Sequence, residues 1–139
     1  MKQLGMHHLD TNYVLTVKSK NEREIKHTHF GNKEYLLAKR DSKYTIHAHN
    51  KSDYECYVMI VTGGNRIGRW LLKEKSTLII KTDKEDKEFV FEDNYHHIIS
   101  GLPDEDTCTH SSIAAVFESE YRPYPVVIKV PVLICEHTV

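Results

Sequence analysis

The chain has 139 residues, enough for a single domain that closes one hydrophobic core without a metal or a disulfide framework. Apolar residues make up 40% of it and charged residues 28%, which is ordinary for a globular protein and argues against intrinsic disorder. Its 19 basic and 20 acidic residues are interspersed and give a net charge of -1, so we expect neither a nucleic-acid partner nor a membrane partner.

Apolar residues recur along the chain with the period of two that is typical of β-strands. This pattern predicts strands at 13–17, 25–30, 34–39, 43–49, 54–62, 66–72, 76–81, 88–92, 113–121 and 126–134. Gly31-Asn32 and Gly63-Gly64-Asn65 fit tight turns, because glycine and asparagine tolerate a positive φ. The best helix candidate, 93–105, is weak. The fold class predicted for residues 1–139 is therefore all-β, a single-domain antiparallel β-sandwich of jelly-roll-like type with little or no helix.

The segment 54–62 is the predicted centre of this sandwich. One of its faces carries Tyr54, Cys56, Val58 and Ile60, and the other carries Tyr57, Met59 and Val61. A strand that is apolar on both faces and rich in β-branched and aromatic residues is typical of a buried central strand. We therefore expect both faces of 54–62 to be covered.

Cysteine usage and the N-terminal residues bear on the cellular compartment. The three cysteines, Cys56, Cys108 and Cys135, form no CxxC pair, and their odd number fits poorly with a disulfide framework. The first residues lack the apolar region of a signal peptide, and no segment approaches the length of a membrane span. We expect an intracellular, cytoplasmic protein, in which the glycosylation sequon at Asn50 has no role.

Two patterns resemble catalytic or nucleotide-binding motifs but lack residues that those motifs need. The stretch 62–70 has glycines spaced as in a phosphate-binding loop, yet Arg69 and Trp70 occupy the positions of the lysine and the hydroxyl residue. Cys108 lies two residues from His110, but the acidic residues 104–106 raise a thiol pKa, and no third orienting residue is identifiable. Neither pattern predicts an active site.

Histidines suggest a metal site as an alternative function. His27 and His29, like His47 and His49, have the spacing that places two imidazoles on one face of a strand. His27-Thr28-His29 with Glu34 resembles part of the first metal-binding motif of the cupins, which implies a β-barrel with histidine and glutamate ligands. His47 and His49 lie on the polar side of a well-patterned strand, however, where a solvated face is the simpler interpretation. No cofactor is predicted, and a cupin-like metal-binding protein or enzyme remains the alternative.

The segment from Lys33 to Phe91 resembles a family of uncharacterised β-sandwich proteins, several of them from large DNA viruses. The similar features are Tyr35-Leu36-Leu37-Ala38-Lys39, Tyr44-Thr45-Ile46, His49-Asn50, Gly63-Gly64-Asn65 and Phe89-Val90-Phe91, with Ile113-Ala114-Ala115-Val116-Phe117 resembling a later strand. The resemblance implies a jelly-roll-like fold and no particular activity.

The C-terminal strand carries the functional prediction. Segment 126–134 is apolar on both faces apart from Lys129, while Pro131 cannot donate a ladder hydrogen bond. A strand that is both edge-like and apolar promotes aggregation unless another part of the chain or a partner covers it. We therefore expect a non-enzymatic protein-interaction or structural module that binds a protein partner or a second copy of itself; the alternative is that its own sandwich covers the strand. The predicted binding residues are Val126, Ile128, Val130, Val132 and Ile134.

Overall fold

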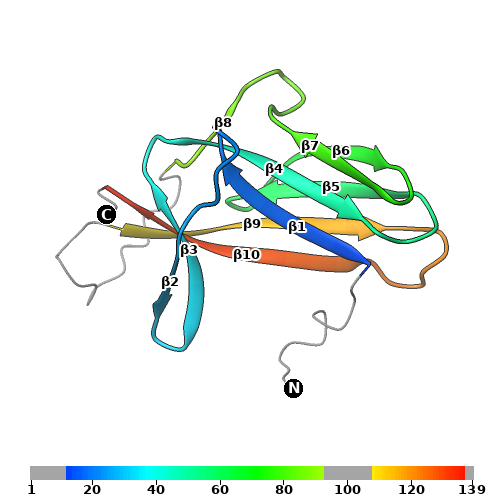
Figure 1. Cartoon of the computed structure of the whole chain (residues 1–139), viewed down its shortest axis with the longest axis horizontal. Coiled ribbons are helices and arrows are strands. Elements are labelled where there is room, and N and C mark those ends of the chain that lie inside the picture. The colour runs from blue at the N-terminus through cyan, green and yellow to red at the C-terminus, as the bar shows by residue number, and fades with distance from the viewer. Residues whose placement is uncertain (1–11, 93–107, 137–139) are drawn as a thin grey trace.

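The computed structural model describes residues 12–92 and 108–136, and these two ranges contain β-strands and no helix. The strands form two sheets that pack against each other (Figure 1). One sheet has six strands: β2 (His27–Phe30), β3 (Lys33–Lys39), β5 (Cys56–Thr62), β6 (Asn65–Leu72), β9 (Cys108–Glu118) and β10 (Val126–Cys135). The other has four: β1 (Tyr13–Ser19), β4 (Lys43–Asn50), β7 (Ser76–Ile80) and β8 (Phe89–Val90). The predicted all-β sandwich is confirmed.

Strand order shows which segments the fold brings together. The six-stranded sheet runs β2-β3-β10-β9-β5-β6, and each of its pairs is antiparallel except β3 with β10. In the four-stranded sheet β4 lies between β1 and β7 and also pairs with β8. Within the described part of the chain, no helix is long and apolar enough to cross a membrane.

The core lies between the inner faces of the two sheets. Its largest fully buried side chains include Phe117 and Ile60 from the six-stranded sheet and Ile46 from the four-stranded sheet. Tyr13 on β1 stacks on Phe117 with ring centroids 4.7 Å apart, which joins the sheets directly. Burial of each such side chain contributes about 1.5–3 kcal/mol, so these alternating inward positions supply much of the stability.

The expectation that both faces of 54–62 are covered is wrong. Cys56, Val58 and Ile60 are at most 2% exposed, but Tyr57 on the opposite face is 43% exposed. The strand β5 has only the edge strand β6 on one side and β9 on the other, and the four-stranded sheet covers only its inner face. Its second apolar face therefore reaches the surface.

The strand that is buried on both faces is β4. Tyr44, Ile46 and Ala48 face the core, while Thr45 and His47 are 4% and 6% exposed on the other side. The predicted solvated face is therefore wrong at His47. The His47 side chain is covered by neighbouring residues. The turn after β1 brings Glu22 Oε2 to 2.9 Å from His47 Nε2, and Thr45 Oγ1 lies 3.2 Å from the same nitrogen.

The C-terminal strand is interior over its second half and edge-like over its first half. The strand β10 pairs with β9 from Val126 to Cys135, and with β3 from Val132 onward. Pro131 lies opposite Ser112 in the unbroken β9 ladder, so its missing N–H faces the β3 side. Pairing with β3 begins one residue later, where N–H groups are available again.

A buried asparagine ties together the end of the sandwich at the β4–β5 connection. The side chain of Asn50 is 1% exposed, and its Nδ2 donates to the carbonyl oxygens of Tyr54, Leu72 and Lys73. Its Oδ1 accepts from the backbone N–H and the hydroxyl of Ser52. The Asn50 amide of the sequon is therefore buried and hydrogen-bonded within the fold.

Turn predictions agree with the backbone. Gly63 and Gly64 have φ values of 54° and 87° and join β5 to β6, and Gly31 has a φ of 66° between β2 and β3. The weak helix candidate 93–105 and the acidic residues 104–106 lie outside the described residues.

Candidate functional site

The histidines of the metal hypothesis are divided between the two sheets. His27 and His29 lie on β2 and Glu34 on β3, whereas His47 and His49 lie on β4 of the other sheet. His27 Nδ1 is 3.8 Å from Glu34 Oε2, and both side chains are more than half exposed. Within 12–92 and 108–136, no group of three or more His, Cys, Asp or Glu side chains could hold a metal ion.

On β4 the two histidines have structural partners. His47 contacts Glu22 and Thr45, and His49 Nδ1 lies 2.9 Å from Thr77 Oγ1 on β7. Partial burial lowers the pKa of His49, and the nearby His47, Lys51 and Lys18 lower it further. These contacts hold both side chains on the outer side of the four-stranded sheet, and the lowered pKa favours the neutral form of the His49 imidazole.

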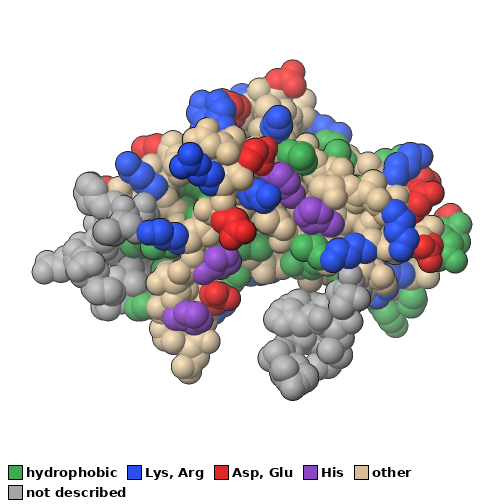
Figure 2. Space-filling view, in the orientation of Figure 1, with side chains coloured by type: hydrophobic (Ala, Val, Ile, Leu, Met, Phe, Trp, Pro, Cys, Tyr) green, Lys and Arg blue, Asp and Glu red, His purple; other side chains and the backbone are tan. Residues whose placement is uncertain are grey.

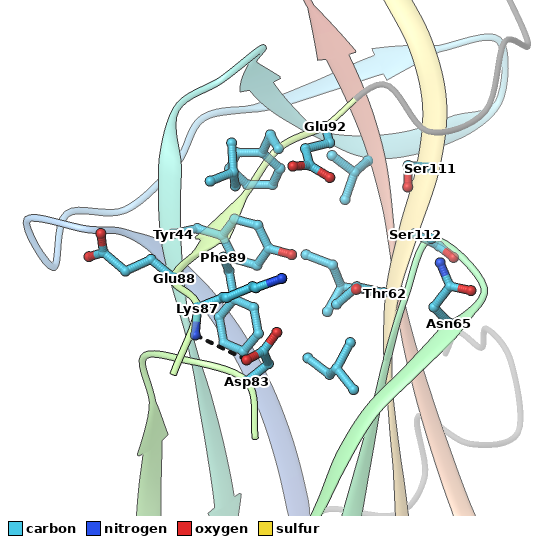
Figure 3. Close-up of a pocket in the computed structure, with 16 residues that line it drawn as sticks. Tyr44, Thr62, Asn65, Asp83, Lys87, Glu88, Phe89, Glu92, Ser111 and Ser112 are labelled. Atoms are coloured by element: carbon cyan, nitrogen blue, oxygen red, sulfur yellow. Dashed lines mark hydrogen bonds between the residues drawn. The ribbon is translucent and has the colours of Figure 1, made fainter. Parts of the chain in front are cut away.

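A polar cleft of about 330 Å³ opens where the β5–β6 turn approaches the segment around β8 (Figure 3). Tyr44, Phe89 and Phe91 are the buried aromatic residues of its lining, and the rings of Phe89 and Phe91 stack on Tyr44 with centroids 5.5 and 4.2 Å apart. Its polar lining consists of Thr62, Asn65, Asp83, Lys87, Glu88, Glu92, Ser111 and Ser112. This mixture of hydroxyl, amide and charged groups suits a small polar ligand.

The Tyr44 phenol is the buried polar group of this cleft. Burial raises its pKa, and the Glu92 carboxylate raises it further, against a hydrogen bond with Thr62 that lowers it. The phenol therefore stays protonated at neutral pH and is unsuited to act as a base. Asp83 is also occupied, because its Oδ1 accepts from the backbone N–H groups of Glu85 and Lys87.

Glu88, at the rim of the cleft, links three segments of the chain. Its carboxylate lies 2.8 Å from the Lys20 ammonium and 2.7 Å from that of Lys43. These two partners lower the pKa of Glu88 to about 2. Since the pKa is lower in the folded state, this stabilisation is complete above the unfolded value of about 4.5 and is lost as the pH falls through about 2.

We expect Glu88→Gln to lower the thermal midpoint slightly at pH 7, because the contact is exposed and screened by water. The difference in thermal midpoint between Glu88→Gln and the wild type should shrink below pH 4.5 and be nearly gone below pH 2. Thermal unfolding followed by circular dichroism across this range measures it. Glu85→Gln, which removes an exposed carboxylate from the same turn, is the control. A difference as large at pH 2 as at pH 7 would contradict the assignment.

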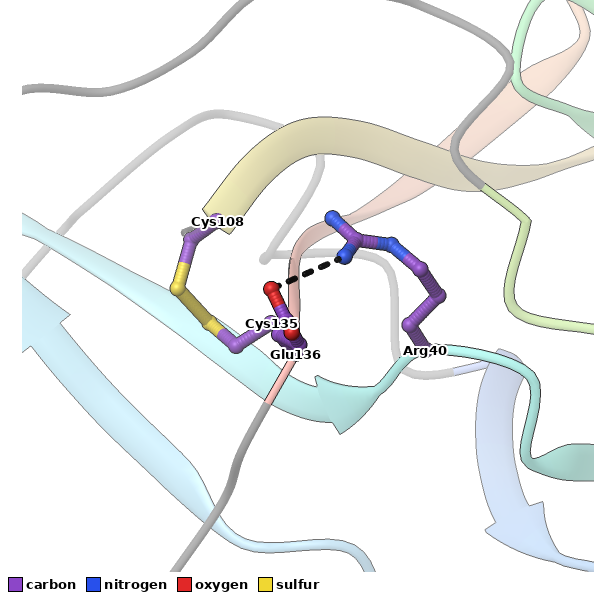
Figure 4. The surroundings of a disulfide bond; sticks show 4 residues. All are labelled: Arg40, Cys108, Cys135 and Glu136. Atoms are coloured by element: carbon purple, nitrogen blue, oxygen red, sulfur yellow. Dashed lines mark ion pairs between the residues drawn. A yellow bond between two sulfur atoms is a disulfide. The ribbon is translucent and has the colours of Figure 1, made fainter. Parts of the chain in front are cut away.

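Two cysteines form a disulfide, so the expectation drawn from the cysteine count is wrong. Cys108 and Cys135 lie opposite each other in the β9–β10 ladder, with Cα atoms 4.0 Å apart, and their sulfurs are bonded (Figure 4). Arg40 Nη1 lies 3.8 Å from Glu136 Oε2 beside it. Disulfides are rare in the cytosol, so this pairing weighs against the cytoplasmic location that we expected.

The disulfide also removes Cys108 as a nucleophile, because the thiolate that catalysis requires is absent from a bonded sulfur. The remaining cysteine, Cys56, is free and buried in the core. Burial raises the pKa of the Cys56 thiol to about 11, so it stays protonated and unreactive at neutral pH.

The five residues predicted to form a binding surface on β10 face the interior. Val126, Val132 and Ile134 belong to the main core, and Ile128 and Val130 pack against it while half-buried. The predicted edge position holds only for residues 126–131, which pair with β9 and not with β3, and the inner face of the strand is covered by its own sandwich. The alternate residues, Val127 and Lys129, are the ones exposed to solvent.

An apolar strip crosses the outer face of the six-stranded sheet. Met59 lies opposite Val116 on β9, and Val116 lies opposite Val127 on β10. In the neighbouring rows, Tyr57 pairs with Leu71 and Val61 pairs with Ala114. We define the outer strip as Tyr57, Met59, Val61, Leu71, Ala114, Val116 and Val127. Each is exposed or half-buried. The sequence showed these residues as apolar but did not show that their face is uncovered.

Exposed aromatic rings adjoin one end of the outer strip. Tyr54 and Tyr121, in the connections β4–β5 and β9–β10, stack with centroids 4.1 Å apart although each ring is more than half exposed. Tyr124 is 78% exposed in the second connection. Figure 2 shows hydrophobic side chains gathered at this end of the molecule, on the right.

The two ends of the outer strip carry opposite charge. A hollow of about 430 Å³ at the Tyr57 end is lined by Glu55, Glu118 and Glu120, with Arg69 as its one cation, and Lys73 pairs with Glu55 at 3.3 Å, so carboxylates remain in excess at this end. Arg69 lies over the Tyr57 ring at 3.9 Å and 3.7 Å from Glu118.

A second hollow, of about 360 Å³, lies beyond the other end of the strip. Lys33, His110 and Lys129 line it together with Gly63, Gly64, Ser111, Ser112 and Pro131, and this lining contains no carboxylate. Arg66 lies nearby on β6, opposite Val61. This end of the strip is therefore basic.

Comparisons with known proteins find no match: no family model, no curated protein and no solved structure resembles this chain. The function is therefore inferred from the residues and geometry described above.

Proposed function

We propose that this chain is a non-enzymatic protein-interaction module that docks on its partner through the outer strip of its six-stranded sheet. The single observation that carries the proposal is the distribution of exposed apolar side chains. Seven large hydrophobic side chains are exposed in the described part of the chain. Six of them, Tyr54, Tyr57, Leu71, Tyr121, Tyr124 and Val127, belong to the outer strip or to the connections at its end, and only Ile79 lies on the other sheet.

The composition of this surface supports the proposal. Tyrosine and arginine are enriched where proteins bind one another, because each combines a large apolar area with a polar group. Four of the six exposed side chains are tyrosines, and the Arg69 guanidinium already stacks on one of them. A contiguous apolar patch on one face of a sheet is typical of an interaction site, whereas scattered single residues are not.

The strand β10 has a different role here from the one inferred from the sequence. Its core-facing residues hold the sandwich together, and its outward residue Val127 completes the central row of the outer strip. The C-terminal strand would thus contribute to docking with the side opposite to the one that we predicted.

Photo-crosslinking in the cells that make the protein tests this proposal. A benzophenone amino acid is introduced at Val127 or, as the matched control, at Ile79 on the four-stranded sheet; these side chains are 47% and 46% exposed. We expect a discrete protein adduct from position 127 that is lost on adding Met59→Lys, and no such adduct from position 79. Equal labelling from both positions, or none from position 127, would overturn the proposal.

A further inference from the structure

We infer that the partner that occupies the outer strip is a second copy of this chain, packed face to face with its strands running in the opposite direction. This inference rests on the proposed docking function and adds the identity and orientation of the partner. The observation behind it is the charge distribution along the strip, acidic at the Tyr57 end and basic at the Lys129 end.

Symmetry explains why this charge distribution selects a second copy. A twofold axis can lie in the plane of the interface, perpendicular to the strands and along the Met59–Val116–Val127 row. Rotation about this axis places the row of one chain against the same row of the other chain. The same rotation brings the acidic end of each chain onto the basic end of the other. A parallel arrangement would instead place like charges together, which costs several kcal/mol in close contact.

The strand register then predicts the contacts. Glu118 and Ala114 lie on β9 two rows apart, on either side of the central row, so the rotation places Glu118 over the partner's Ala114. Lys129 lies beside Ala114 on the neighbouring strand β10. Each Glu118 carboxylate therefore meets the Lys129 ammonium of the other copy, and Tyr57 meets Val61.

Within one chain Glu118 and Lys129 are too far apart to interact. Four residues of extended strand separate Glu118 from Ala114, which is about 13 Å. Glu118 has the exposed Arg69 as its intrachain partner at 3.7 Å. Any coupling between Glu118 and Lys129 therefore has to arise between two molecules.

The area of the strip sets the expected strength. Four strands spaced about 4.8 Å apart and six residues of rise cover on the order of 400 Å² per copy. Stable interfaces bury about 800 Å² per partner, and smaller ones form weak, transient complexes. The dimer should therefore assemble reversibly in the micromolar range rather than persist on dilution.

Sedimentation velocity of the purified full chain from 1 to 500 µM tests the inference. We expect a monomer–dimer equilibrium that Val127→Lys abolishes. Glu118→Lys alone and Lys129→Glu alone should each weaken association at least tenfold, because each places like charges together at two symmetric contacts. The double variant should recover most of the wild-type affinity. Lys81→Glu changes the same charge outside the strip and should leave association unchanged.

Two results would overturn the inference. One is a wild-type chain that remains monomeric at 500 µM, and the other is a double variant no better than the single variants. If the purified chain is monomeric while position 127 still crosslinks to a different protein in cells, the partner is that protein rather than a second copy of the chain. The docking function then stands. If position 127 forms no adduct at all, both fail.

Discussion

Replacing Ile60 with aspartate should leave the chain unable to fold. Ile60 is fully buried on the inner face of β5, directly between Gly68 of β6 and Ala115 of β9. The substitution removes about 1.5–3 kcal/mol of apolar burial and places a carboxyl group where no water reaches it, which costs several kcal/mol more. Domains of this size are stable by about 5–15 kcal/mol, so little or no stability would remain.

Circular dichroism and urea unfolding measure this effect. Met59→Asp is the matched control, because Met59 is the neighbouring residue on the same strand but faces outward in the outer strip. The control should retain a cooperative transition and a β-sheet spectrum. A soluble Ile60→Asp protein that melts cooperatively would show that this position is not in the core.

Removing the disulfide should cost about 2–4 kcal/mol of unfolding free energy, the second largest effect that we expect. The bond joins residues 27 apart, so it restricts the unfolded chain by closing a loop that contains the β9–β10 connection. It also belongs to a small buried cluster on the outer face of the sheet, with Tyr35 and Leu133. The Cys108→Ser, Cys135→Ser double variant should therefore unfold at lower urea concentration than the wild type.

Reductant and thiol titration provide the controls. Reductant should lower the stability of the wild type toward that of the double variant and leave the double variant unchanged. The denatured, unreduced wild type should titrate with one thiol, from Cys56, and with three after reduction. Three thiols before reduction in protein purified under oxidising conditions would contradict the pairing.

Sequence pattern predicted the strands closely because alternation of apolar and polar residues is a local property. Segment 43–49 became β4 and segment 126–134 became β10 with shifts of one residue or less at each end. The largest differences concern β9, which begins at Cys108 rather than at 113, and β8, which keeps only two of the five predicted residues. Serine, threonine and histidine at 109–112 look like a loop in the sequence, but their partners on β10 draw them into the ladder.

Burial could not be predicted from the same pattern. An apolar face indicates what a strand can bury, not whether another layer lies above it. The outer face of β5 is as apolar as its inner face, yet the four-stranded sheet covers only one of them. His47 shows the converse, since its burial depends on Glu22, 25 residues earlier in the chain.

By itself, then, the sequence determined the fold class, the strand positions and the tight turns, because each depends on residues that are close together in the chain. Only the tertiary structure decided that β10 lies between β3 and β9, that Cys108 and Cys135 meet, and that Met59, Val116 and Val127 form one row on the surface. Each of these depends on strand order and register, which bring together segments tens of residues apart. Local periodicity carries no information about such distances.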